Sequence, residues 1–201
     1  MLVYSDQSAA QEGFAFSAAP QGVGMGYGDL FIFGGVMTEG DFPGSAMVPL
    51  MGSLEDVFVA GAAYNHEFAN HGPDWSFGGE VGLAGRFGNQ SSADFWIGPS
   101  LRYNGFSIGS LTVSFGIVAG FSAVTSSSGI ERVREVTDGG DAALTYYLGP
   151  EIGLTFDALP DKQFLFRSHH RSGGKNVSFL PTIGNMGDAS NAYLFGVRQP
   201  F

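Results

Sequence analysis

The sequence contains no cysteine, which excludes disulfide bonds, thiolate catalysis and cysteine-based metal sites. Charged residues make up only 14% of the 201 residues, and Arg86 is the sole lysine or arginine among the first hundred. A net charge of −10 with nine Lys and Arg residues excludes the basic surface of a nucleic-acid-binding protein, so no nucleic-acid partner is expected. No apolar run reaches the ~20 residues that a membrane-spanning helix requires. The apolar residues are instead distributed over short segments.

Glycine and aromatic residues are abundant, with 32 Gly and an aromatic fraction of 14%. This composition departs from that of an ordinary soluble domain, and it favours a β-barrel built from short strands. Residues 1–20 lack the basic region and the continuous apolar region of a signal peptide. We predict an N-terminal leader over residues 1–28 and one barrel domain over residues 29–201.

Eight segments alternate between apolar and small or polar residues, and they predict eight strands. The predicted strands are 29–40, 56–68, 75–88, 93–104, 110–124, 143–156, 163–173 and 189–201. Each is long enough for a tilted membrane strand, which needs ~9–11 residues. No helical period of useful length competes with this pattern. The fold class predicted is all-β, an eight-stranded antiparallel transmembrane β-barrel.

The predicted connections differ in length at the two ends of the barrel. Those at one end are 41–55, 89–92, 125–142 and 174–188, and those at the other are 69–74, 105–109 and 157–162. Bacterial outer-membrane barrels combine long external loops with short periplasmic turns. The asymmetry therefore predicts a location in the bacterial outer membrane. The Ser-rich 125–129 and acidic 136–141 segments are expected to be exposed loop.

Charged side chains on the inward parity are expected to form an ion-pair network inside the barrel, because a small barrel fills its interior with side chains. They are Glu80, Arg86, Arg102, Glu151, Arg167 and Arg198. The wet face of a soluble barrel or sandwich would alternate in the same way, so the pattern alone leaves that alternative open.

The seventh predicted strand carries a general base and a hydroxyl on its outward, aromatic face. His170 and Ser172 are two residues apart, ~6.6 Å along a strand, so their side chains can approach one another. A serine hydrolase needs a base beside the nucleophile and a third group that orients the base. Ser172 would attack, His170 would take its proton, and Asn191 or Asp188 would orient the imidazole. Asn185 or a loop backbone N–H would hold the oxyanion.

Other polar residues have simpler structural interpretations. His169 has inward parity and is expected to be a satisfied interior or rim group. Arg171 and Lys175 are candidates for contact with lipid phosphates, although a solvated loop face is the commoner role. His66 and His71 lie near a predicted turn without a metal-binding pattern, so neither a metal nor another cofactor is expected.

The segments HHRSG (169–173) and GDASN (187–191) resemble the lipid A 3-O-deacylases, an acyloxyacyl hydrolase-like family of outer-membrane barrels. The resemblance is one of motif over the last two predicted strands and one of architecture elsewhere. It implies an esterase that removes an ester-linked acyl chain from lipid A with a Ser–His–acid triad on the lipid-facing wall. It also implies lipid A or lipopolysaccharide and outer-membrane lipids as partners, with the active site toward the outer leaflet.

Two positions depart from the family pattern. Asn191 stands where the family has its acid, and Gly173 stands where the family has Asn. The departures favour an alternative, a non-catalytic structural or adhesive outer-membrane barrel with a degenerate site. A soluble ligand-binding barrel is a third hypothesis, opposed by the terminal Phe201, which resembles an outer-membrane assembly signal. Whether two copies form a homodimer is left open.

Overall fold

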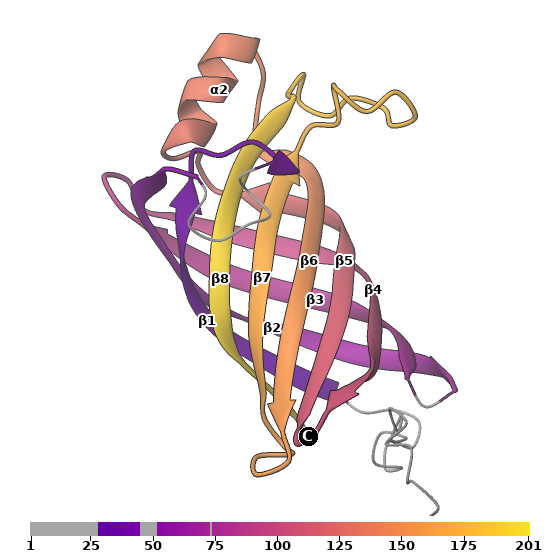
Figure 1. Ribbon diagram of the computed structural model, residues 1–201. Helices are drawn as coiled ribbons and strands as arrows, with labels where there is room; N and C mark the ends of the chain where they lie inside the picture. The colour runs from indigo at the N-terminus through magenta and orange to yellow at the C-terminus, as the bar shows by residue number, and fades with distance from the viewer. Residues whose placement is uncertain (1–27, 45–51, 73) are drawn as a thin grey trace, which may run out of the picture.

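The computed structural model describes residues 28–44, 52–72 and 74–201, which form a closed barrel of eight antiparallel strands (Figure 1). The strands are β1 (Gly28–Thr38), β2 (Leu54–His71), β3 (Trp75–Phe87), β4 (Ser92–Ile108), β5 (Leu111–Val124), β6 (Leu144–Phe156), β7 (Gln163–Ser172) and β8 (Asp188–Pro200). Consecutive strands pair, and β1 pairs with β8 to close the sheet. The predicted fold class is confirmed. The predicted leader lies outside the described residues, apart from Gly28, with which β1 begins.

The two faces of each strand differ in the way that the sequence alternation predicts. In β5, Val118 and Ser122 point inward and are buried, whereas Phe115 and Phe121 point outward and are 48% exposed. The exposed apolar side chains continue around the barrel and include Ile32, Phe58, Leu83, Phe95, Ile97, Ile152 and Phe195. Soluble proteins rarely expose so continuous an apolar surface, which is typical of a lipid-facing wall.

Buried ion pairs occupy the barrel interior between β3, β4, β6, β7 and β8. Arg167 donates to Glu80 Oε1 (2.5 Å) and to Glu151 Oε2 (2.6 Å). Arg198 Nη2 lies 2.8 Å from Glu151 Oε1, and Arg102 Nε lies 3.3 Å from the same oxygen. Buried charges persist only when they are paired, so these contacts satisfy groups that the inward parity commits to the core. The predicted interior network is confirmed for five of its six members, whereas Arg86 pairs with Asp94 (2.5 Å) and Glu131 (2.7 Å) in a separate cluster.

One helix, α2 (Ile130–Asp138), stands in the connection between β5 and β6, above the end of the barrel (Figure 1). Its Glu131 is fully buried and pairs with Arg86 (2.7 Å) and with Arg171. The helix therefore closes this end with a carboxylate directed into the interior. In the part of the chain that the structure describes, no helix is long and apolar enough to span a membrane.

The connection predicted at 125–142 is present at 125–143, but the expectation of exposed loop within it is wrong in part, because residues 130–138 are helical and Ser127 and Ser128 are buried. An isolated helix of nine residues is unstable in water. Contacts with the barrel stabilise it instead: the Ile130 N–H donates to Glu55 Oε2 (2.8 Å) from β2. Gly139 ends the helix in the left-handed conformation (φ 62°), where glycine is favoured.

Arg171 lies inside the barrel, so neither predicted role for it, lipid contact or solvated loop, is correct. Its side chain is fully buried, and it donates to Ser122 Oγ (2.8 Å) and to the Ala142 carbonyl (2.7 Å) in addition to Glu131. The predicted strand 163–173 already gives Arg171 the inward parity of His169, and the structure follows this parity to the end of β7 at Ser172. His169, on the opposite parity from His170, is also buried.

The connections are longer at one end of the barrel, as the sequence predicts. Residues 39–53, 88–91, 125–143 and 173–187 connect strands at the end that carries α2, here called the loop end. Residues 72–74, 109–110 and 157–162 connect strands at the other end, the turn end. The C-terminus lies at the turn end (Figure 1), where the Phe201 N–H donates to the Gly28 carbonyl (3.0 Å).

Candidate active site at the loop end of β7 and β8

The candidate catalytic residues meet where β7 ends and β8 begins. His170 of β7 is directly opposite Asn191 of β8, and Ser172 is opposite Asp188. The register shifts between these two pairs, because β8 carries one extra residue, a β-bulge. On a regular strand, Asp188 and Asn191 would point to opposite faces because they are three residues apart. The extra residue of the bulge turns Asp188 to the same face as Asn191. Asp188, whose position in a predicted loop left its direction open, therefore reaches His170.

The orientation of His170 is determined by the Asn191 side chain. The Asn191 amide nitrogen donates to the Gly40 carbonyl (2.6 Å) and to Asp188 Oδ2 (3.3 Å). Both of those atoms can only accept, so the amide oxygen must face His170 Nδ1, which lies 2.6 Å away. The Nδ1 atom must then carry the proton. The lone pair of the neutral ring is on Nε2, where a general base needs it.

Asp188 supplies negative charge to the imidazole. Its Oδ1 atom lies 3.4 Å from His170 Nδ1, and its carboxylate is mostly buried. Arg134 of α2 lies on the other side, with Nη1 3.7 Å from Asp188 Oδ2. Arg134 also donates to the carbonyls of Glu39 and Ala189 and pairs with Asp41. The helix thus ties the β1–β2 connection and the bulge together beside the carboxylate.

Ser172 is near this cluster but its hydroxyl bonds to the backbone. It donates to the Gly187 carbonyl (2.9 Å) and accepts from the Gly174 N–H (3.1 Å). Although the structure describes both residues, no hydrogen bond joins Ser172 to His170. A rotation of the serine side chain is needed to bring its proton to Nε2. Catalytic hydrogen bonds are often absent before substrate binds, so this geometry does not exclude the pair.

Asn185 does not reach the serine. Its side-chain amide donates to the Asp138 carbonyl (3.0 Å) at the end of α2, and its backbone has a positive φ of 54°. Asn185 therefore connects the 173–187 loop to the helix, instead of facing the position of an oxyanion. A donor already directed at Ser172 is the Gly174 N–H, a loop backbone group of the kind that the sequence analysis gave as the alternative.

Gly173 departs from the family pattern for a steric reason. A Cβ atom at this position would lie 2.4 Å from the carbonyl oxygens of both Ile183 and Met186. The Gly173 N–H donates to the Gly187 carbonyl (2.8 Å) and its carbonyl accepts from the Ile183 N–H (2.7 Å). The loop therefore folds back on the residue after the serine so closely that no side chain fits.

Phe42, which the sequence analysis did not select, covers His170. Its ring stacks on the imidazole with centroids 4.2 Å apart and planes inclined by 19°. Its backbone N–H donates to Asp188 Oδ2 (3.1 Å). The residue comes from the connection after β1, remote in sequence from β7, and no motif marks it. The sequence alone therefore offered no signal for this contact.

We expect Phe42→Ala to raise the rate at which diethylpyrocarbonate modifies His170 several-fold. Removal of the ring uncovers one face of the imidazole, whose side chain is now only 11% exposed. The rate is measured by mass spectrometry of peptides from folded protein. His71, which is exposed at the turn end, serves as the internal control. An unchanged rate at His170 would show that the ring does not limit access.

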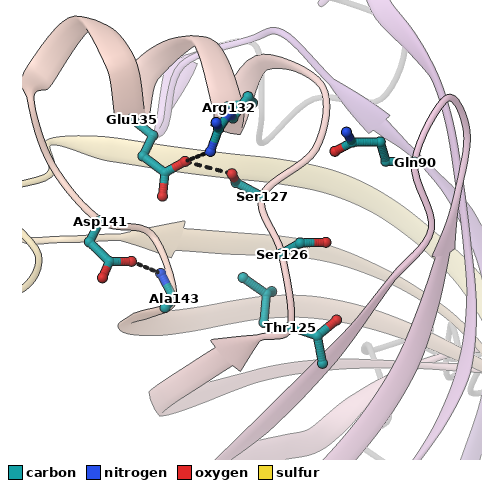
Figure 2. A pocket seen from close by; sticks show the side chains of 9 residues that line it. Gln90, Thr125, Ser126, Ser127, Arg132, Glu135, Asp141 and Ala143 are labelled. Carbon is teal, nitrogen blue, oxygen red and sulfur yellow. Dashed lines mark hydrogen bonds and ion pairs between the residues drawn. The ribbon is translucent and has the colours of Figure 1, made fainter.

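A polar cavity of about 370 Å³ lies at the loop end beside α2 and is lined by Thr125, Ser127, Arg132 and Glu135 among others (Figure 2). The Ser127 hydroxyl donates to Glu135 Oε2 (2.6 Å) and holds the pKa of this carboxyl below its usual value. The contact is therefore present at neutral pH and is lost as the pH falls through that lowered pKa. His170 does not line this cavity. The Ser127–Glu135 hydrogen bond connects the start of the 125–143 connection to α2.

Comparisons with known proteins identify the fold. No family model and no curated protein matches the sequence. Among solved structures, the outer membrane enzyme PagL is similar over 86% of this chain and 99% of its own, with 13% identity and a TM-score of 0.50. Neisserial surface protein A is similar over 87% of this chain and 95% of its own, with 9% identity and a TM-score of 0.53.

OprG from Pseudomonas aeruginosa covers 88% of this chain and 96% of its own, with 12% identity, but its TM-score of 0.44 is too low to support an argument. The first two similarities include an enzyme and a surface protein, and at these identities they establish architecture alone. The chain has the fold of the small eight-stranded outer-membrane β-barrels.

Proposed function

We propose that the protein is an outer-membrane esterase in which Ser172 and His170 remove an ester-linked acyl chain from lipid A. The observation that carries the proposal is the hydrogen bond from His170 Nδ1 to Asn191 Oδ1 (2.6 Å). Because the Asn191 amide is oriented by the Gly40 carbonyl and Asp188, this bond leaves Nε2 as the base. The substrate class comes from the resemblance of the two loop-end segments to the lipid A 3-O-deacylases.

In the proposed reaction, the Ser172 hydroxyl turns from the Gly187 carbonyl to His170 Nε2. The serine oxygen attacks the ester carbonyl as Nε2 takes its proton, and the Gly174 N–H stabilises the oxyanion. The imidazolium returns the proton to the departing alkoxide, which leaves an acyl-serine. A water molecule then attacks the acyl-serine as His170 takes its proton, and the imidazolium returns this proton to the Ser172 oxygen as the fatty acid leaves.

Asp188 compensates for the asparagine in the acid position. An amide can orient the imidazole but cannot stabilise the positive charge that the ring acquires during attack. The Asp188 carboxylate, 3.4 Å from Nδ1, supplies that charge from the neighbouring position that the bulge creates. The two roles of a triad acid are thus divided between Asn191, which orients, and Asp188, which stabilises charge.

The proposed location is the bacterial outer membrane with the loop end outward. The exposed belt of apolar side chains supports contact with lipid, and His170 lies at the belt's loop-end border on an outward face. An ester near the headgroups of the outer leaflet would lie at this height. A soluble ligand-binding barrel is less consistent with an interior occupied by paired arginines and carboxylates.

Mass spectrometry of lipid A tests the proposal. Detergent-folded protein is incubated with lipid A beside the Ser172→Ala variant, and both are checked for a folded barrel by heat-modifiable migration on gels. Wild type should release one acyl chain, and the variant should release none. Release of the same chain by both proteins would exclude Ser172 as the nucleophile.

The second candidate is a non-catalytic barrel with a structural or adhesive role. Two contacts favour it. The Ser172 hydroxyl is hydrogen-bonded to the Gly187 carbonyl instead of to His170, and the ring of Phe42 covers the His170 imidazole. A folded wild type that leaves lipid A and simple nitrophenyl esters intact would establish this alternative over the esterase.

A further inference from the structure

The connection between β7 and β8, residues 173–187, carries an exposed apolar tip and reaches sideways from the loop end (Figure 1). We call Val177, Phe179, Leu180 and Pro181 the loop tip. Phe179 is 83% exposed, more than any other large apolar side chain that the structure describes, and Leu180 is 37% exposed. Apolar side chains that gather on a surface, unlike scattered ones, mark contact with another molecule or with a membrane.

The backbone of this connection holds the loop tip in a defined conformation. The Val177 N–H donates to the Gly174 carbonyl (2.9 Å), and the Leu180 N–H donates to the Val177 carbonyl (3.1 Å). Hydrogen bonds between residues three apart close two successive turns. Phe179 lies within the second turn, so a hydrogen-bonded backbone presents its ring to the outside.

Tyr146 of β6 fixes the loop tip beside the outward wall of the barrel. Its hydroxyl donates to the Pro181 carbonyl (3.0 Å), and its ring is so close to Gly174 that a Cβ atom there would lie 2.9 Å from it. The ring also lies 5.6 Å from that of Phe121 in the apolar belt. Leu144, the next outward residue of β6 toward the loop end, is 50% exposed. The apolar wall therefore continues past the level at which the loop tip is attached.

A lysine without a carboxylate partner stands beside the loop tip. All seven arginines of the chain pair with carboxylates, whereas the exposed Lys175 makes no ion pair with any residue that the structure describes. A lysine can lay its methylene groups along apolar surface while its ammonium group reaches a polar layer. Exposed apolar side chains next to a free cation are typical of segments that lie in the interface of a membrane.

We propose that the loop tip is a membrane anchor, which inserts Phe179 and Leu180 at the headgroup boundary of the leaflet around the loop end and places Lys175 on a lipid phosphate. Continuity with the apolar belt favours lipid as the occupant, because the tip is attached where that belt ends. The inference requires a barrel in a membrane but not the proposed ester chemistry.

The anchor would also set the height of the candidate nucleophile in the membrane. The loop tip begins five residues after Ser172, and the turn that leads into it starts at Gly174, whose N–H donates to the Ser172 hydroxyl (3.1 Å). Lipid contact at the tip would therefore hold this end of β7 at the level of the headgroups.

Spin labelling measures the depth of the loop tip, and the absence of cysteine from the chain makes single labels specific. Ser178→Cys places a nitroxide beside Phe179, and the barrel is folded into vesicles of phosphatidylcholine and phosphatidylglycerol. Paramagnetic resonance compares collisions with oxygen, which concentrates in the bilayer, and with a water-soluble nickel chelate. Labels at Ser91, exposed in the 88–91 connection, and at Ile152, exposed on the outward wall, are the water and lipid references.

The ratio of oxygen to nickel collisions at position 178 should exceed the Ser91 ratio several-fold and approach the Ile152 ratio. A ratio equal to that of Ser91 would overturn the proposal. Low collision rates with both reagents would also overturn it, since they would mean that the tip is buried against a second copy or another protein. Neither measurement depends on ester cleavage, so an inactive protein tests the anchor equally well.

Substitutions in the labelled chain identify the side chains responsible. Replacing Phe179 and Leu180 together by serine should return the ratio to that of the water reference. Val136→Ser, at a 72% exposed valine of α2, is the matched control and should leave it unchanged. An unchanged ratio in the double variant would exclude these two side chains as the anchor.

The phosphate contact is tested by charge reversal. Lys175→Glu should lower the ratio at the label several-fold, because a carboxylate is repelled by phosphatidylglycerol. Lys162→Glu, at the other lysine of the chain and at the turn end, is the control and should have no effect. Equal ratios in the two variants would exclude Lys175 from the anchor.

Discussion

His170→Ala and Ser172→Ala should each slow ester hydrolysis by about 10⁴-fold or more, and the double variant should be no slower than either single variant. The serine is a nucleophile only when the imidazole removes its proton, and the imidazole has no other step without the serine. Groups that act as a unit lose their effect together. The measurement is the single-turnover rate of p-nitrophenyl ester cleavage by detergent-folded protein.

The histidine control for this series is His71→Ala, which removes an exposed imidazole at the turn end and should leave the rate unchanged. Heat-modifiable migration confirms that each variant retains the barrel. Losses that multiply in the double variant would contradict the assignment, because they would mean that the two side chains contribute independently. Residual cleavage from the exposed histidines would show that the ester reacts without the site.

Much of the barrel is predictable because the alternation has a physical cause that acts on every strand. A residue such as Glu151 or Arg167 cannot face lipid unpaired, and a residue such as Phe115 gains nothing from an interior already filled. Each strand therefore has one acceptable orientation. The same reasoning places His170 and Asn191 on one outward face, and the structure pairs them.

The details of the candidate site depend on features without a periodic signal. The bulge that turns Asp188 toward His170 inserts one residue, and an alternation count cannot detect it within a loop. Phe42 and Arg134 reach the site from connections remote in sequence. Asn185 bonds to the end of α2, a helix that the sequence analysis did not predict. Loop contacts of this kind are determined by tertiary structure.

The role of α2 leads to the second large effect. Glu131→Ala should lower the free energy of unfolding by about 3–5 kcal/mol, the cost of removing one partner from a buried ion pair. Its carboxylate is completely buried and accepts from Arg86, Arg171 and the Ser190 hydroxyl (3.0 Å). Without it two buried guanidinium groups lose a counter-charge, although Arg86 keeps Asp94. Urea titration of the barrel in lipid vesicles measures the loss.

Glu135→Ala is the control on the same helix, because its carboxylate is partly exposed and accepts from Ser127 (2.6 Å), the Ala142 N–H (3.1 Å) and the exposed Arg132 (2.9 Å). That change should cost less than Glu131→Ala, because it leaves no guanidinium group buried without a counter-charge. Trypsin provides a local readout: cleavage after Arg132 and Arg134 should accelerate in Glu131→Ala well below the urea concentration that unfolds the strands. If the helix only rests on the loop end, the two alanine variants will unfold together and trypsin will cut both alike. A selective loss in Glu131→Ala would mean that this one carboxylate anchors α2, and with it Arg134 beside Asp188, to the barrel interior.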